Sequence, residues 1–206
     1  LWTPLFFSHA NMLYRRMEGL LDRLGFHEPH SPIAPDQGKY SLALLGFHRL
    51  AASMLHELKR SDPEVLDNIL VVDFNVHAHP QIAAHGPTVR YGDLANSDAL
   101  HHAGVDKAHV VLITLQDDLL TGTSNKHIIA SVRKMNPDAT IIACATEYRE
   151  ITQLYETGAD FVYLAHVETA RGLVPAISSA LEGNIRAYKA GREAVDGALH
   201  ARSGIL

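Results

Sequence analysis

From about residue 39 onward, short runs of apolar residues alternate with longer stretches whose apolar positions recur every three or four residues. Most of the runs are continuously apolar, which is typical of parallel strands covered on both faces, because a strand with one wet face alternates instead. The pattern predicts six strands, over residues 40–47, 69–74, 88–91, 110–115, 140–145 and 161–164.

The stretches between these runs carry the signals that begin and end helices. An apolar stripe over residues 50–58 predicts the first helix, and a weak helix ending at Gly86 is expected after the second strand. Three further helices are expected, from a cap at Asn96 or Ser97 to Gly104, from a cap at Ser124 to just before Pro137, and from Thr146 to Gly158.

Strand–helix alternation repeated five times predicts an α/β fold, a Rossmann-like doubly wound parallel sheet of six strands. We place this domain at residues 39–165. The remaining segment, 166–206, is expected to be helical over 166–190. Pro175 and Gly183 lie inside that stretch, so we expect either a kink or two shorter helices.

The first 38 residues have a different pattern. Residues 8–25 fit an amphipathic helix, and residues 26–38 contain three prolines, which makes them a linker. The chain begins with Leu1 and an apolar, aromatic heptad too short to span a bilayer. We therefore expect 1–38 to join this domain to a membrane domain of a longer parent chain.

Composition removes several classes of function. A formal net charge of −5 argues against a general nucleic-acid surface, and the single cysteine excludes an internal disulfide and any multi-cysteine metal site. Cys144 falls in an apolar strand and is interpreted as a small buried residue. Fourteen histidines are unusual, but none of their spacings defines a metal site, and we expect no metal. A pH-sensing role and a solvated surface role both stay open for them.

The first strand-to-helix turn should carry a glycine-rich phosphate loop, and here it reads Gly46-Phe47-His48-Arg49-Leu50-Ala51. The first glycine is present and Ala51 is an accepted small residue at the third position, but His48 stands at the second position, where glycine lets the backbone approach a pyrophosphate. The loop is thus a partial nucleotide fingerprint that lacks its phosphate-proximal glycine.

Polar residues stand at the ends of three other predicted strands. Asp73 ends the second strand, where an acidic side chain accepts hydrogen bonds from ribose hydroxyls in dinucleotide-binding folds. Asp93 follows the third strand and Thr114 ends the fourth. The carboxyl ends of parallel strands meet at one edge of the sheet, so these residues and the glycine loop are expected to lie together.

Five segments resemble a known family, the TrkA-N domain, also called RCK or KTN. They are Leu45-Gly46-Phe47-His48-Arg49-Leu50-Ala51-Ala52-Ser53, Val71-Val72-Asp73-Phe74-Asn75, Tyr91-Gly92-Asp93 with Ala103-Gly104-Val105, Val111-Leu112-Ile113-Thr114, and Tyr155-Glu156-Thr157-Gly158-Ala159-Asp160. The resemblance covers about residues 40–165. The stretch Gly122-Thr123-Ser124-Asn125 and the loop without its second glycine look closest to the branch of Kef-type antiporters.

The resemblance implies a non-enzymatic regulatory domain on the cytoplasmic face of the cell membrane, gating a potassium- or sodium/proton antiporter of the same parent chain. It also implies a homodimer, for which residues 166–190 are the candidate contact. In this family an adenine nucleotide lies on the first loop, which makes Gly46, His48 and Arg49 the candidate phosphate contacts. Asp73 is then the candidate ribose contact and Asp93 the neighbour of the adenine, with Thr114 at the same edge.

His48 departs from the family pattern and changes the expected ligand. A side chain there occupies space that a dinucleotide needs, so AMP is sterically easier to place than NAD(H). His48 itself has two interpretations, a ligand contact or pH switch, and a residue tolerated in an empty loop. Asp73 can instead cap the next helix, Arg49 can be solvated, and Asp93 can be a turn residue.

Two alternatives to the regulatory hypothesis remain at this stage. One is an NAD-dependent oxidoreductase, against which stand the missing glycine and the lack of a Tyr-x-x-x-Lys pair or comparable proton-transfer pair at a strand end. The other is a structural dimerisation module with a vestigial nucleotide pocket.

Overall fold

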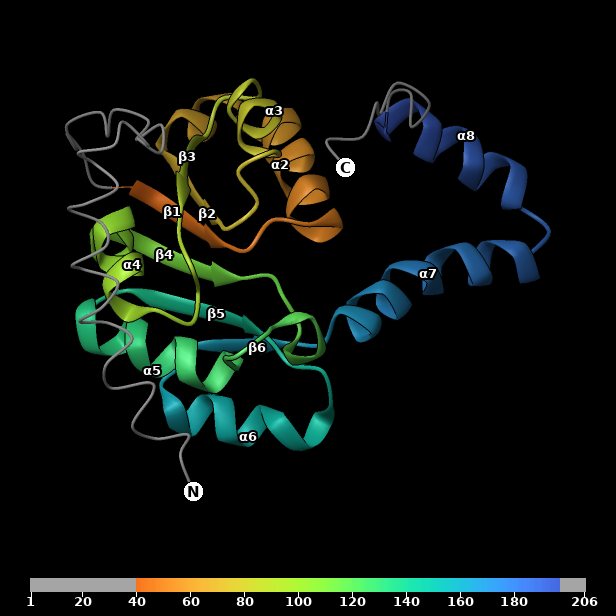
Figure 1. Cartoon of the computed structure of the whole chain (residues 1–206). Helices are drawn as coiled ribbons and strands as arrows, with labels where there is room; N and C mark the ends of the chain where they lie inside the picture. The colour runs from red at the N-terminus through yellow and green to blue at the C-terminus, as the bar shows by residue number, and fades with distance from the viewer. Residues whose placement is uncertain (1–39, 197–206) are drawn as a thin grey trace, which may run out of the picture. The chain divides into compact units, whose positions relative to one another are not determined.

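The computed structural model describes residues 40–196. Its centre is one parallel sheet of six strands, and helices lie on both sides of it (Figure 1). The strands are β1 (Tyr40–Leu45), β2 (Ile69–Asp73), β3 (Thr88–Tyr91), β4 (Ala108–Ile113), β5 (Thr140–Cys144) and β6 (Phe161–Tyr163). The predicted helix at 8–25, the linker at 26–38 and the last ten residues lie outside the described part.

The strand order is β3-β2-β1-β4-β5-β6, and every neighbouring pair is parallel. The chain winds outward from β1 to β3, returns to the middle at β4 and winds outward the other way. The order therefore reverses between β1 and β4, and in such sheets ligands bind beyond the carboxyl ends of the strands at this point. The predicted α/β fold, a Rossmann-like doubly wound sheet, is confirmed.

The helices are α2 (Arg49–Ser61), α3 (His79–Ala83), α4 (Ser97–Ala103), α5 (Asn125–Met135), α6 (Tyr148–Thr157), α7 (Ala165–Leu181) and α8 (Ile185–Asp196). Asn96 caps α4 and Ser124 caps α5 through their side chains, as predicted. The prediction for α6 was wrong by two residues at its start. Glu147, not Thr146, is the cap, because Glu147 and Glu150 form a reciprocal capping box.

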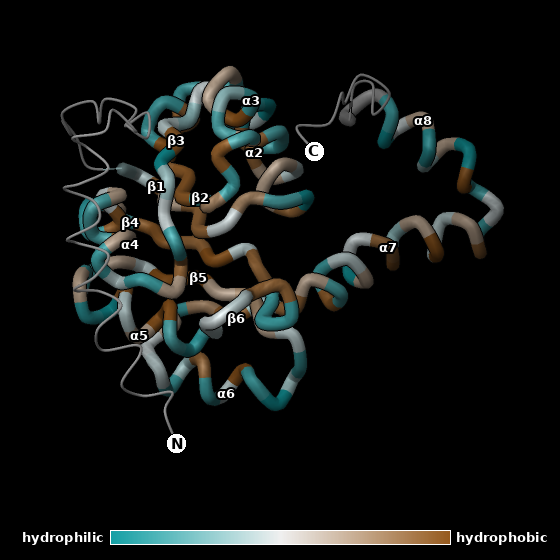
Figure 2. Tube along the Cα trace, in the orientation of Figure 1, coloured by the Kyte–Doolittle hydropathy of each residue, from teal (hydrophilic) through white to brown (hydrophobic). Residues whose placement is uncertain are grey.

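The two faces of the sheet carry separate apolar cores. One core joins residues of β1, β2, β4 and β5 to α4, α5 and α6, and the other joins the opposite faces of β1 and β2 to α2, α3 and the 3-10 helix Pro63–Asn68. Alternation along β1 shows the arrangement: Ala43 and Leu45 belong to the first core and Leu44 to the second. Figure 2 shows the most apolar segments running through these central strands.

The segment after β6 forms two helices rather than one kinked helix. Gly183, with a φ of 77°, lies between α7 and α8, whereas Pro175 lies within α7. Glycine adopts positive φ without the steric cost that a Cβ imposes, which explains why the break occurs there. No residue of α7 is buried. No helix within residues 40–196 is long and apolar enough to cross a membrane.

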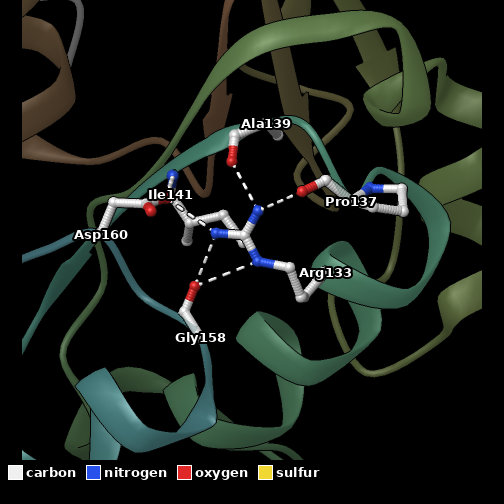
Figure 3. Close-up of polar contacts among 6 residues, drawn as sticks. All are labelled: Arg133, Pro137, Ala139, Ile141, Gly158 and Asp160. Atoms are coloured by element: carbon white, nitrogen blue, oxygen red, sulfur yellow. Dashed lines mark hydrogen bonds and ion pairs between the residues drawn. The ribbon is translucent and has the colours of Figure 1, made fainter.

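One arginine holds the amino ends of β5 and β6 to helices α5 and α6 (Figure 3). The guanidinium of Arg133 donates to the carbonyls of Pro137, Ala139 and Gly158 and to the carboxylate of Asp160, at distances of 2.7–3.2 Å. The backbone N–H of Ile141 donates to the same carboxylate at 2.7 Å.

The charge of Asp160 depends on these partners. Burial by itself raises the pKa of Asp160, but the hydrogen bond from Ile141 and the guanidinium of Arg133 together outweigh it, so the pKa lies below its usual value of 3.8. Asp160 is therefore an anion at neutral pH. This contact lies at the amino ends of the strands, whereas the candidate site lies at their carboxyl ends. We interpret the contact as structural.

Candidate nucleotide site

The first loop after β1 has the geometry of a phosphate loop. Gly46 is buried, has a φ of 80°, and donates its N–H to the carbonyl of Val72 at 2.9 Å. A Cβ on Gly46 would collide with the side chain of Leu115, which lies over the glycine from the end of β4. Glycine is thus required here by the backbone conformation, and an added Cβ would in addition force the side chain of Leu115 to move.

Thr114 fastens the glycine loop to β4. Its hydroxyl donates to the carbonyl of Gly46 at 2.8 Å, and its backbone N–H donates to the carbonyl of Leu45 at 3.3 Å. The side chain is 1% exposed, so this hydrogen bond is made in a dry environment where leaving the carbonyl unpaired is costly. Thr114 therefore positions the loop from within the fold.

Asp73 also positions the glycine loop, from the end of β2. One carboxylate oxygen accepts the N–H of Phe47 at 2.7 Å and the other accepts the N–H of Asn75 at 2.7 Å. The residue is 5% exposed. Its carboxylate does not cap α3, which was the alternative at this position; α3 has no side-chain cap. Instead Asp73 connects the glycine loop to the turn after β2.

His48 begins α2. Its backbone is extended, and its ring atom Nδ1 accepts the N–H of Leu50 at 3.2 Å, which makes it the N-cap of the helix. An N-cap side chain pairs one of the N–H groups that the first turn of a helix leaves unsatisfied, and those are the same groups that bind phosphate in nucleotide folds. His48 thus occupies part of the phosphate position with its own side chain.

The remaining predicted site residues are exposed and lie beside this edge. Arg49 is the first residue of α2. Asp93 accepts the N–H of Ala95 at 2.9 Å in a turn after β3. The structure therefore brings Gly46, His48, Asp73 and Thr114 into one hydrogen-bonded loop system, with Arg49 and Asp93 at its exposed margin.

Asn125 was missed as a site residue by sequence reasoning. Its side-chain amide donates to the carbonyls of Leu115 (2.9 Å) and Cys144 (2.8 Å), and its backbone N–H donates to the carboxylate of Asp117 (2.7 Å). It is 1% exposed, and its Oδ1 has no hydrogen-bond partner within the described residues. Asn125 joins the ends of β4 and β5, and in the sequence it looks like an ordinary residue beside a helix cap.

Two exposed aromatic residues were not predicted to belong to the site. Phe74 follows Asp73 and is 69% exposed, while Tyr91, the register partner of Asp73 on β3, is 62% exposed. Alternating burial predicts which side of a strand a residue takes, but it carries no signal for an aromatic side chain left in water at a strand end. An aromatic ring exposed at a strand end can stack on a planar ligand such as a nucleotide base.

Burial confirms the interpretation of Cys144. Cys144 is fully buried and unpaired, and burial raises the pKa of its thiol, so it is an inert core residue as predicted. No group of three histidine, cysteine, aspartate or glutamate side chains within residues 40–196 is arranged to hold a metal ion.

Comparison with known proteins assigns the class. The family model for the TrkA-N domain matches residues 42–165, which is more than half of the chain. The chain therefore belongs to this family. The curated relative named "Putative cation/proton antiporter YbaL", from Escherichia coli (strain K12), is 25% identical over 142 residues, covering 69% of this chain and 24% of that protein. The chain spans about a quarter or less of the length of the curated relatives that it matches.

Solved structures agree on the fold. The crystal structure of the TrkA-N domain of the E. coli inner membrane protein YbaL has a TM-score of 0.57 and 24% identity, covering 68% of this chain and 97% of that one. The GsuK channel bound to NAD has a TM-score of 0.52 and 21% identity, over 77% of this chain and 26% of that one. The Kef C-terminal domain from Shewanella denitrificans, in an AMP-bound form, has a TM-score of 0.50 and 19% identity, over 75% of this chain and 87% of that one.

Proposed function

We propose that this chain is the regulatory domain of a monovalent cation/proton antiporter and that it senses an adenine nucleotide at the carboxyl edge between β1 and β4. The observation that carries the proposal is the intact frame of the phosphate loop. Gly46 keeps its positive φ, and two buried side chains, Asp73 and Thr114, hold the loop from neighbouring strands. Relatives of the same family are parts of antiporters and channels, and two of them carry AMP or NAD.

The geometry supports one placement of the nucleotide. The phosphate lies at the start of α2 beside the exposed side chain of Arg49, and the ribose lies near Asp73. The adenine then lies near the exposed residues that end or follow β2 and β3, Phe74, Tyr91 and Asp93, where a base can stack on an aromatic ring. Because each oxygen of Asp73 already accepts a backbone N–H, its ribose contact uses the second lone pair of an oxygen.

A thermal-shift and calorimetric panel of AMP, ADP, ATP, NAD⁺ and NADH tests the proposal. We expect AMP to bind and NAD(H) to bind more weakly, because His48 fills the position of the second glycine. Phe74→Ala and Tyr91→Ala should each weaken AMP about tenfold, from a stacking free energy of about 1–3 kcal/mol per base. Phe161→Ala is the matched control. Phe161 is 50% exposed and lies on β6, the edge strand at the opposite end of the strand order from β3.

The panel separates the alternatives. Binding of none of the nucleotides contradicts the sensing role and favours a structural module with a vestigial pocket. Turnover of NADH with a carbonyl substrate contradicts the non-enzymatic assignment and favours the oxidoreductase.

The proposal includes a homodimer formed through α7. Leu173, Val174, Ile177 and Leu181 lie on one face of this helix and are 55–85% exposed. On the sheet face that carries α2 and α3, Tyr163 of β6 and Ile142 of β5 are only partly buried. A second copy that covers these apolar surfaces would form an isologous interface.

Light scattering after size exclusion tests this contact. Ile177→Asp should convert a dimer into a monomer, because it places a charge in the centre of the apolar face. Gly172→Asp is the control, since it adds the same charge on the opposite side of α7, where an added Cβ meets no atom within 4 Å. A dimer that survives Ile177→Asp would refute the assignment of α7.

The antiporter assignment extends beyond this chain. We propose that the transmembrane antiporter domain belongs to the same parent protein and that this domain lies on the cytoplasmic face of the cell membrane. The nucleotide regulates transport only as far as it binds one conformation of the dimer more tightly than another.

A further inference from the structure

The start of α2 joins two features that compete for the same atoms. The N–H groups of the first turn are the phosphate-binding donors of a nucleotide fold, and here one of them, the N–H of Leu50, is already paired with Nδ1 of His48 at 3.2 Å. A phosphate that takes the Leu50 N–H must displace the imidazole. His48 is partly buried and belongs to neither apolar core, so displacement of its ring removes no core side chain.

The cap has a strict requirement for the protonation state of the ring. Nδ1 accepts a hydrogen bond only when it carries no proton, so the capping imidazole is the neutral tautomer with its proton on Nε2. A protonated ring has no acceptor left. It would also place a positive charge at the positive end of the helix dipole. Protonation therefore releases the Leu50 N–H.

A bound phosphate reverses both effects. The displaced imidazolium can donate a charge-assisted hydrogen bond to the phosphate, and the phosphate cancels the unfavourable charge at the helix start. We infer that His48 couples nucleotide binding to the uptake of a proton: neutral His48 closes the phosphate position as the cap of α2, and protonated His48 opens it and holds the phosphate. This inference rests on the nucleotide site proposed above and adds its regulation.

Several other polar groups at this edge make hydrogen bonds of their own. Asp73 accepts two backbone N–H groups, His79 on α3 bonds through Nε2 to the carbonyl of Asp73 at 3.0 Å, and Asp117 accepts the N–H of Asn125. The charged and titratable residues close to these strand ends are Arg49, Asp73, His77, His79, Asp93, Asp117 and Asp118, and further along α2 lie His56, Glu57, Lys59 and Arg60. His77 and His79 carry imidazoles like that of His48, and comparison of His48 variants separates its contribution from theirs.

Two variants of His48 separate the cap from its titration. His48→Asn keeps a good N-cap acceptor that does not titrate near neutral pH, so the phosphate position stays closed at every pH. His48→Gly restores the second glycine and leaves the position open at every pH. Because the backbone at His48 is extended, with a φ of −146°, both residues fit without strain. Thermal unfolding of each variant verifies that it is folded.

The experiment is calorimetric titration of the whole chain with AMP between about pH 5.5 and about pH 8, in buffers of different ionisation enthalpy. AMP itself titrates in this range, with a second phosphate pKa of about 6, and His79 can contribute too. Both contributions are common to the wild type and the variants and cancel in the comparison. Adenosine, which lacks the phosphate, is the ligand control.

We expect the affinity of the wild type for AMP to rise, relative to His48→Asn, by about tenfold from the upper to the lower pH, with additional proton uptake per AMP bound. His48→Gly should bind more tightly than His48→Asn at pH 8 and share its pH profile. The same pH dependence in all three proteins would overturn the coupling and leave the nucleotide site standing. No AMP binding in any of them, His48→Gly included, would overturn the nucleotide site and the coupling with it.

Discussion

Replacement of Asp73 should destabilise the fold itself, apart from any effect on a ligand. Asp73→Ala removes the acceptor of two backbone N–H groups at 2.7 Å each, and the bond from Phe47 is buried. Hydrogen bonds to a charged partner contribute about 1.5–3 kcal/mol each. With the part-buried Asn75 bond taken at the lower end, we expect a loss of about 3–4.5 kcal/mol. Asp73→Asn keeps one oxygen acceptor and should lose about half as much.

Urea unfolding followed by circular dichroism measures these losses. Asp93→Ala is the matched control, because Asp93 is exposed and accepts a single N–H within its own turn, so its loss should be about 0.5–1 kcal/mol. A value for Asp73→Ala within about 1 kcal/mol of the wild type would refute our view that this carboxylate builds the loop.

The structural role of Asp73 also decides how its ligand role must be tested. Asp73→Ala distorts the glycine loop, so a loss of AMP binding in that variant does not identify a ribose contact. Comparison of AMP with 2′,3′-dideoxy-AMP on the wild-type protein avoids the mutation. We expect the dideoxy ligand to bind about tenfold more weakly, and equal affinity would exclude Asp73 as a ribose acceptor.

Three further predictions concern the frame of the site and the opposite edge. Gly46→Ala should cost about 1–3 kcal/mol in urea unfolding, because it forces a Cβ into a φ of 80° and against Leu115; Gly46→Ala with Leu115→Ala should recover only part of this loss, and full recovery would show that the backbone conformation is unimportant. Arg133→Ala should lower the free energy of unfolding by about 2–4 kcal/mol and Arg133→Lys by nearly as much, since one ammonium group cannot reach four acceptors; a fully stable lysine variant would contradict this. Asp160→Asn should be less stable than the wild type at neutral pH. Because the pKa of Asp160 is lowered by folding, the difference should persist down to its usual value of 3.8 and vanish as the pH falls further through the folded pKa, so a difference that is independent of pH would refute the charge argument.

Sequence periodicity was sufficient to predict the six strands, the helices between them and their order along the chain. The runs around β2 and β5 are recognisable because burial on both faces requires continuous apolar residues, a property that each strand carries by itself. The caps at Asn96 and Ser124 were predictable for the same reason, since a side chain that bonds an N–H two or three residues away acts within its own segment. The cap of α6 was missed because Glu147 acts only together with Glu150.

The candidate site was predictable in its residues and only partly in their roles. Gly46, Asp73 and Thr114 stand at strand ends, and parallel topology alone brings such ends together. What each side chain does there depends on its partners. Asp73 bonds a loop 26 residues before it, and Thr114 bonds a carbonyl 68 residues before it.

The sequence by itself determined that this protein is a doubly wound parallel sheet with a modified glycine loop, because periodicity, caps and strand-end residues act over a few positions of the chain. The tertiary structure alone decided that Asp73 and Thr114 hold the glycine loop, that Leu115 covers Gly46 and that Asn125 joins β4 to β5. The physical reason is the directionality of hydrogen bonds and the short range of steric contact. Both depend on where a partner lies in space to within an ångström or less, and that position exists only after the strands are packed side by side.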